Sequence, residues 1–242
     1  MITHTAFAVS VNDTRPALNG SFFKIEGGNV TVVSCDGNRL AIKQCHCEME
    51  KINMDEEPSM KFILPGKSLT ELTKLLSDNE ETVSVKLGRK HAIFFLNGYF
   101  FFTRLIEEEY VDYERYIPKT SRIFVTIACD PFIRSLERAS LVTEDRTMGQ
   151  AKSTLVCLFE DDLLKIQSNS VTGSVYDEIP IEKTGEDLKI GFNCRHLLDA
   201  LRACDVDTIK VSLTTALMSM VIQPAEEDPD NTFLFLVLPV RM

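Results

Sequence analysis

The sequence predicts an α+β protein that contains two copies of one unit, in which helices alternate with strands. Three observations predict this fold class: two collinear blocks of internal similarity, segments with the period-two pattern of strands, and leucines at helical spacing. The chain has 242 residues, which is enough for two domains of ordinary size. Its 44% hydrophobic and 26% charged residues are typical of a folded globular protein.

The internal similarity indicates a duplication. The segment Ile25–Ser34 returns as Phe159–Ser168, 134 positions later. The segment Ser68–Leu87 returns as His196–Leu213, at offsets of 128 and then 126 positions. Because the two matches occur in the same order, we interpret them as equivalent parts of two homologous units.

In the first copy the elements alternate along the chain. A helix is predicted over Thr3–Val9, and the alternation in Asn29–Ser34 predicts a half-buried strand. Leucines 69, 72, 75 and 76 stand at helical spacing after Pro65-Gly66, so a second helix is expected there. The segment Thr82–Leu87 alternates again and predicts another half-buried strand.

The second copy shows the same order of elements. A strand over Arg122–Ile127 precedes a helix over 131–142, for which Asp130 is the expected N-cap and Pro131 the first helical residue. Leucines 197, 198 and 201 indicate a further helix, with Asn193 as its N-cap. The apolar segment Phe233–Val240 near the C-terminus predicts a buried last strand.

We place the boundary between the copies near residue 113, within the charged segment Glu107–Pro118, which gives domains of residues 1–113 and 114–242. The chain carries 26 basic and 36 acidic residues, a net charge of -10. This charge argues against a surface that is basic throughout and wraps a polyanion, but it permits a local basic stripe.

Localisation is expected to be cytoplasmic. The apolar segments are far shorter than the roughly 20 residues of a membrane helix, and the N-terminus lacks the pattern of a secretory signal. Seven cysteines, an odd number without regular spacing, predict reduced thiols.

No catalytic or metal motif is convincing. Pro65-Gly66-Lys67-Ser68 resembles the end of a phosphate loop, but Lys61 stands where the first glycine should be. Zinc at Cys45-His46-Cys47 lacks a second ligand pair, and the histidines at positions 4, 91 and 196 stand apart. The acidic stretches 107–112 and 226–230 are interpreted as solvated loops. We therefore expect no enzyme activity, cofactor or metal.

Several short motifs resemble a known family. They are Arg15–Gly20, Ser34–Ala41 with its Asp-Gly-Asn-Arg-Leu-Ala sequence, Phe102–Ile106 followed by Asp112-Tyr113 and Ile117-Pro118, and the final Leu238–Met242. Together and in this order they resemble the bacterial beta sliding clamp, the processivity factor of DNA polymerase III. The resemblance extends over the whole chain and implies the DNA-clamp fold, with two helices and two antiparallel sheets in each domain.

The resemblance implies a role as well. Family members have three such domains per subunit and close head to tail as a homodimeric ring around duplex DNA. The chain is similar to the second and third domains only, with the first strand and part of the first helix of the second domain missing. The implied partners are duplex DNA, bound without sequence specificity, and the replicative polymerase, the clamp loader and repair proteins, bound through linear peptide motifs. No membrane partner is implied. The alternative is a truncated clamp that binds such peptides but cannot encircle DNA.

Position by position, the resemblance implies two walls of a peptide-binding groove between the domains. The first wall is Leu18, Cys35, Gly37, Asn38, Arg39, Leu40, Val111, Arg115 and Tyr116. The second is Leu217, Ser219, Leu236, Leu238, Pro239, Val240, Arg241 and Met242. Family helices also face DNA, and the helix cations available for this are Lys67, Lys74, Arg134, Arg138, Arg195 and Arg202.

Overall fold

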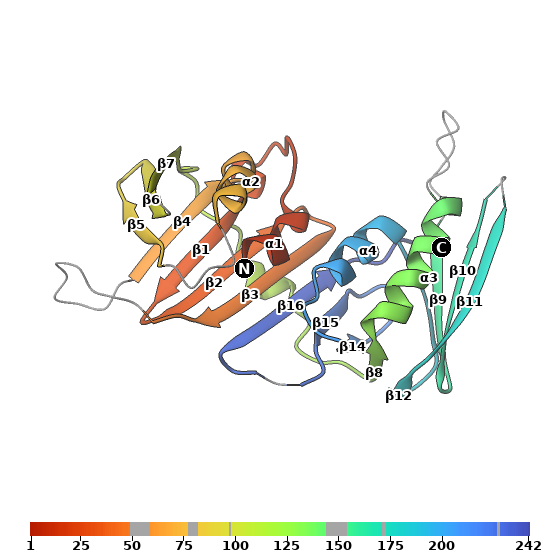
Figure 1. The fold of residues 1–242 in the computed structure, drawn as a ribbon. Coiled ribbons are helices and arrows are strands. Elements are labelled where there is room, and N and C mark those ends of the chain that lie inside the picture. The colour runs from red at the N-terminus through yellow and green to blue at the C-terminus, as the bar shows by residue number, and fades with distance from the viewer. Residues whose placement is uncertain (49–58, 77–81, 97, 144–153, 171–172, 227) are drawn as a thin grey trace. The chain divides into compact units, whose positions relative to one another are not determined.

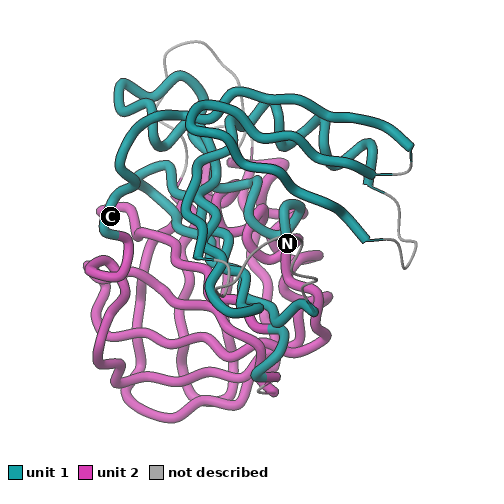
Figure 2. Tube along the Cα trace, turned by 90° about the vertical axis from the view of Figure 1, so that its left-hand side faces the viewer, with its two compact units in different colours: residues 1–112, 229–231 teal, residues 113–228, 232–242 magenta. Residues whose placement is uncertain are grey.

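The computed structural model describes residues 1–48, 59–76, 82–96, 98–143, 154–170, 173–226 and 228–242. The chain forms two compact units (Figures 1 and 2). Unit 1 contains Met1–Asp112 and Pro229–Asn231, and unit 2 contains Tyr113–Asp228 and Thr232–Met242. Each unit is described by itself.

Unit 1 has two antiparallel sheets and two α-helices in its described part. The first sheet has the order β4-β1-β2-β3 and the second the order β5-β6-β7. The elements in chain order are α1 (Ile2–Thr5), the 3₁₀ helices η1 (Ala6–Ala8) and η2 (Pro16–Asn19), β1 (Gly20–Glu26), β2 (Asn29–Cys35), β3 (Arg39–His46), β4 (Ser59–Pro65), α2 (Gly66–Leu75), β5 (Ser84–Leu87), β6 (His91–Leu96) and β7 (Tyr99–Arg104).

Unit 2 has the same arrangement, but its sheets contain more strands. Their orders are β12-β8-β14-β15-β16 and β11-β10-β9-β13. Its elements are η3 (Tyr113–Tyr116), β8 (Ile123–Ala128), α3 (Cys129–Thr143), β9 (Leu155–Glu160), β10 (Leu163–Asn169), β11 (Ser174–Pro180), β12 (Glu182–Thr184), β13 (Leu188–Phe192), α4 (Cys194–Arg202), β14 (Thr208–Leu213), β15 (Met220–Pro224) and β16 (Asn231–Val237). In its described part each unit thus has two α-helices and two antiparallel sheets, which confirms the fold class.

The repeat in the sequence falls on equivalent elements. The first block corresponds to the hairpins β1–β2 and β9–β10, in which Glu26 pairs with Asn29 and Glu160 with Leu163. A two-residue turn closes each hairpin, and its first residue has a positive φ: 55° at Gly27 and 48° at Asp161. This conformation suits tight hairpin turns, for which glycine and aspartate are favoured. The second block corresponds to α2 with β5 and α4 with β14.

In unit 1, α2 packs one apolar face against both sheets. Leu69 and Leu72 are almost fully buried and lie in one cluster with Phe62 and Leu64 of β4 and with Phe94 of β6. The lysines of α2 face solvent. In unit 2 the helices α3 and α4 pack against each other, and Phe132, Leu136, Leu197 and Leu201 are fully buried there.

Four expectations for local structure need correction. The strand β2 is not half-buried, because its neighbours Val32 and Val33 point to opposite faces and both have no exposed surface. One face lies towards the helices, and on the other Tyr110 stacks on Phe22 at 5.2 Å between ring centroids. The strand expected from Thr82 begins at Ser84. The helix expected over 3–9 is the short α1, continued by η1.

The fourth correction concerns the start of α3, where Asp130 is not the N-cap. The helix begins at Cys129, whose amide donates to the carbonyl of Asp207 at 2.8 Å. The Asp130 carboxylate therefore lies within the first turn and accepts a hydrogen bond from Arg134 Nε at 3.1 Å. For α4, in contrast, the expected N-cap is confirmed: the Asn193 Oδ1 accepts from the amides of Arg195 and His196, at 3.0 and 3.4 Å.

The cap of α4 leads to a prediction about stability. Replacing Asn193→Ala removes the acceptor for two amides that have no partner within the helix, and we expect the free energy of unfolding to fall by about 1 kcal/mol. Urea unfolding followed by circular dichroism measures this change. Asn193→Asp keeps an acceptor oxygen at this position, so it should stay close to the unsubstituted protein. An equal loss in both variants would contradict the capping role.

Candidate functional site

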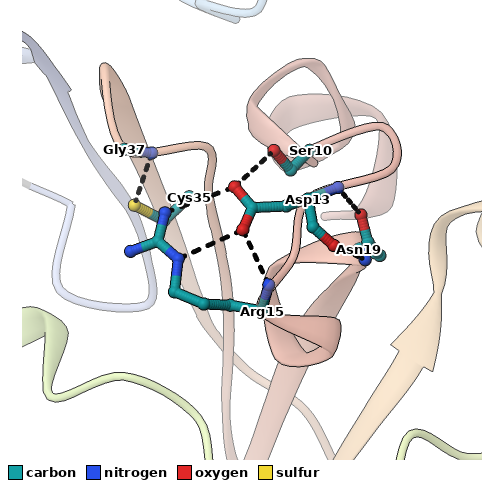
Figure 3. Close-up of polar contacts among 6 residues, drawn as sticks. All are labelled: Ser10, Asp13, Arg15, Asn19, Cys35 and Gly37. Carbon is teal, nitrogen blue, oxygen red and sulfur yellow. Dashed lines mark hydrogen bonds and ion pairs between the residues drawn. The ribbon is translucent and has the colours of Figure 1, made fainter.

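Most of the expected binding residues lie in three parts of the chain: a loop and turn of unit 1, the C-terminal segment of unit 2, and the helices. In unit 1 the loop of residues 10–19 is organised by Asp13 (Figure 3). Asp13 Oδ1 accepts from Arg15 N at 2.9 Å and Arg15 Nε at 3.1 Å, and its other oxygen is 3.5 Å from Ser10 Oγ. The Asp13 amide donates to Asn19 Oδ1 at 2.8 Å, and Asn19 Nδ2 returns a bond to the Asp13 carbonyl at 3.0 Å.

These bonds favour the ionised carboxylate. The hydrogen bond from the Arg15 side chain, followed by the one from the Arg15 amide, lowers the pKa of Asp13. The loop in turn positions Leu18, which is 1% exposed. Leu18 therefore belongs to the core of unit 1, and so does Leu40, which is also buried.

The turn between β2 and β3 contains the central motif. Asp36 Oδ1 accepts from the amides of Asn38 and Arg39, at 2.9 and 3.0 Å, and Asp36 Oδ2 accepts from Arg39 Nε at 2.9 Å. The Arg39 guanidinium also lies over the ring of Phe7, 5.4 Å from its centroid. Arg39 thus holds the turn together, and its contacts with Asp36 and Phe7 were not predicted from the sequence.

Gly37 has a φ of 87°, which a residue with a side chain rarely adopts, and its amide lies 3.4 Å from Cys35 Sγ (Figure 3). Burial raises the pKa of the Cys35 thiol. Of the remaining expected residues of this wall, Val111 belongs to unit 1, whereas Arg115 and Tyr116 lie on η3 of unit 2. Tyr116 is 59% exposed.

Large apolar side chains are exposed at the C-terminus of unit 2 and in the loop before β15. Met220 pairs with Val237, so the residues just beyond this ladder, Met218-Ser219 and Leu238-Pro239, leave the same end of the β15–β16 pair. Ser219 and Leu236 are buried, whereas large apolar side chains are exposed at Leu217, Met218, Leu238 and Met242. We call these four residues the C-terminal apolar surface. Met218 was not expected from the sequence, although it adjoins Leu217.

The tail continues onto the second sheet of unit 2. The amide of Val240 donates to the carbonyl of Gly191 in β13 at 2.9 Å. A Cβ atom on Gly191 would lie 2.9 Å from Met242 Cγ and 3.0 Å from the Val240 carbonyl oxygen. A side chain at this position would therefore push the tail away from β13, and Gly191 was not among the residues identified from the sequence.

The six helix cations are on α2, α3 and α4, and most of them form ion pairs. Lys74 Nζ is 2.7 Å from Glu71, Arg134 is 2.8 Å from Asp130, Arg202 is 2.7 Å from Glu137, and Arg138 bonds Asp177. Lys67 and Arg195 are exposed near the N-termini of α2 and α4. The carboxylates offset much of the positive charge that these helices could present to a polyanion.

The motifs that were rejected as catalytic or metal-binding sites make structural contacts. Gly66 begins α2, and the hydroxyls of Ser68 and Thr103 are 2.6 Å apart. The thiols of Cys45 and Cys47 are 3.3 Å apart, and burial raises the pKa of Cys45 to about 11, which disfavours the thiolate that would bind a metal. Within the described ranges, no three His, Cys, Asp or Glu side chains converge on a possible metal position. Glu227, in the acidic stretch 226–230, lies outside them.

Comparison with known families identifies the chain. Residues 1–112 match the model of the DNA polymerase III beta subunit, central domain, and residues 114–241 match that of its C-terminal domain. The chain belongs to the DNA polymerase III beta subunit family. No helix in the described part of this family member is long and apolar enough to cross a membrane.

Individual clamps are similar over the full chain. The Beta sliding clamp of Bacillus subtilis is 32% identical over 243 residues, and the alignment covers 100% of this chain and 61% of that protein. The crystal structure of the Bacillus subtilis clamp superposes with a TM-score of 0.88 at 32% identity, with 61% of it covered. That of the beta chain from Streptococcus pneumoniae does so with a TM-score of 0.88 at 30% identity, with 62% covered. The chain thus spans about three fifths of the length of these relatives.

The Asp13 network leads to a prediction about pH. Because the folded-state pKa of Asp13 is lowered, its ionisation contributes stability above the unfolded pKa of about 3.9, and this contribution is lost as the pH falls through the folded value. We expect Asp13→Asn to be less stable than the unsubstituted protein at neutral pH, with a difference that shrinks below about pH 4. Urea unfolding at a series of pH values measures it. Glu109→Gln, which removes an exposed carboxylate of the same unit, is the control, and a pH-independent difference for Asp13→Asn would contradict the prediction.

Proposed function

We propose that this chain acts as a sliding-clamp processivity factor, which tethers the replicative polymerase, the clamp loader and repair proteins to DNA without catalysing a reaction itself. The observation that carries the proposal is the match of two consecutive clamp domains over residues 1–112 and 114–241. The similarity in fold to the Bacillus subtilis clamp, at a TM-score of 0.88, supports it. We place this activity in the cytoplasm, where bacterial DNA is replicated.

The partners would bind as short linear peptides at the C-terminal apolar surface. Leu217 is 75% and Met242 63% exposed, so the side chains present an unusual amount of apolar area to solvent for one short segment. Aliphatic and aromatic side chains of a peptide such as Gln-x-x-Leu-Phe would bury this area. Methionine side chains adapt their shape, which suits a surface that accepts several related sequences.

Affinity for such a peptide should be modest. A short peptide loses conformational freedom when it is ordered, and this loss offsets much of the gain from apolar burial. We expect a micromolar dissociation constant, which corresponds to a standard free energy of binding of about -8 kcal/mol.

Peptide binding is tested by substituting the C-terminal apolar surface. We expect Leu238→Ser to weaken the binding of a labelled Gln-x-x-Leu-Phe peptide by about tenfold, because burial of a leucine side chain contributes about 1.5 to 3 kcal/mol. Fluorescence polarisation measures the constant. Leu141→Ser is the matched control, since Leu141 is 81% exposed on α3 of the same unit and outside this surface.

Gly191→Ala examines the same surface without changing any residue proposed to touch the peptide. The added methyl group would lie 3.0 Å from the Val240 carbonyl oxygen and 2.9 Å from Met242 Cγ, so the tail must shift away from β13. Weaker binding in this variant, with an unchanged thermal transition, is the expected result. If Leu238→Ser and Gly191→Ala both bind the peptide as the unsubstituted protein does, the C-terminal apolar surface is not the binding site.

Encirclement of DNA is a separate part of the proposal. A closed homodimeric ring slides off linear DNA but stays on a circle, so we expect the protein, loaded by a clamp loader, to be retained on circular plasmid and released when the plasmid is cut. Gel filtration of the loaded complexes measures this. Peptide binding without retention on circles would favour the alternative, a clamp fragment that binds partner peptides but does not encircle DNA.

A further inference from the structure

The outer face of the three-stranded sheet of unit 1 carries exposed aromatic rings. Phe95 of β6 is paired with Phe100 of β7, and Ile93 of β6 with Phe102 of β7, so all four side chains are on one side of the sheet. Phe100 is 74% and Phe102 60% exposed. The opposite side of the same strands belongs to the core, where Ala92, Phe94 and Leu96 are buried.

The rings lie close to one another and to cationic side chains. Phe95 and Phe100 meet edge to face with 4.9 Å between centroids, and His91 stacks on Phe102 at 4.8 Å. Lys86 Nζ is 5.2 Å from the centroid of Phe95. Arg104 pairs with His91 in the ladder and so lies on this side as well. We call this surface the aromatic face, formed by Lys86, His91, Ile93, Phe95, Phe100, Phe102 and Arg104.

The charge of this segment differs from that of the rest of the chain. Residues 84–106 contain four lysines or arginines and no aspartate or glutamate, in a chain that has 36 acidic residues and a net charge of -10. Arg89 and Lys90 form the exposed turn between β5 and β6. Lys90 forms an ion pair with Glu107, which lies just beyond the segment, at 2.9 Å, and among the described residues the other three cations form no ion pair. The face is therefore locally basic as well as aromatic.

We propose that the aromatic face binds single-stranded nucleic acid. Exposed aromatic rings on a sheet stack on unpaired bases, and flanking lysine and arginine side chains neutralise the phosphates. Both features are present on one face here. In a duplex the bases stack on one another, so they cannot lie flat on the phenylalanines. A second copy of the chain fits less well, because two such faces would bring like charges together.

This inference goes beyond the proposed function, because it concerns a surface on unit 1 that shares no residue with the C-terminal apolar surface of unit 2. A bound single strand would hold unpaired DNA beside the protein without passing through a ring. Binding by stacking is tolerant of sequence, so preference for single strands over duplex is expected to exceed any preference among bases.

Fluorescence anisotropy with a labelled oligothymidylate of about 15 nucleotides, a length that covers the site sizes of known single-strand binders, tests the proposal. We expect saturable binding that weakens as salt is raised, and weaker binding of a duplex of equal length. Phe100→Ala with Phe102→Ala should lower the affinity by about tenfold or more, because each stacked base contributes about 1 to 3 kcal/mol. Phe100→Tyr with Phe102→Tyr should keep the affinity of the unsubstituted protein, because tyrosine rings also stack on bases.

The chain offers a matched control for this experiment. Phe124 of β8 is 39% exposed and has Lys210 Nζ 5.3 Å from its ring centroid, so Phe124→Ala removes a similar aromatic and cation pair in unit 2. It should leave oligothymidylate binding unchanged. The double alanine variant should also keep its affinity for the Gln-x-x-Leu-Phe peptide, which separates this proposal from the proposed function.

A second double variant tests the proposal if the double alanine variant folds poorly. Lys86→Glu with Arg104→Glu changes only exposed side chains and should abolish the salt-dependent part of the binding. Absence of saturable binding by the unsubstituted protein would overturn the proposal, and so would binding that survives both pairs of substitutions. Sedimentation showing self-association that depends on Phe100 and Phe102, without oligothymidylate binding, would instead identify a second copy as the occupant.

Discussion

Unit 1 depends on one packing constraint: a short helix must cover two antiparallel sheets with a single apolar face. In unit 1 this helix is α2, whose leucines 69 and 72 contact residues of β4 and β6 in one cluster. Burial of each leucine contributes about 1.5 to 3 kcal/mol, a large share of the stability of a domain of this size. The outer faces of the sheets, the turns and the tail are left to carry function.

Sequence periodicity located α2 and α4 because most of their leucines are both regularly spaced and buried. Leucines 197, 198 and 201 are buried, as their spacing indicated, and the similarity between copies identified the hairpins β1–β2 and β9–β10. The start of α3 was not predictable in this way. It depends on the bond from the Cys129 amide to the Asp207 carbonyl, which joins positions distant in sequence.

Motif resemblance is less informative about what each site residue does. Leu18 and Leu40 stand in family motifs and Leu236 follows from the position-by-position resemblance, but all three side chains are buried in the core. Asp13, Met218 and Gly191 stand in no short motif. Their roles depend on contacts of loops and of the tail, which no local pattern in a single sequence encodes. The family motifs of the two units also form different structures. The motif of unit 1 forms a hydrogen-bonded turn, whereas that of unit 2 forms a tail that packs on Gly191.

The aromatic face has a consequence for how the chain behaves before it is folded. Residues 92–103 contain no charged side chain and six aromatic ones, a composition with a strong tendency to form intermolecular β-structure. Lys90 and Arg104 flank this segment and act as gatekeepers, because like charges on neighbouring chains repel each other. In an unfolded or nascent chain, aggregation should therefore start in unit 1, at β6 and β7, and a substitution that removes either flanking charge should lower the yield of soluble protein even where the folded structure is unchanged.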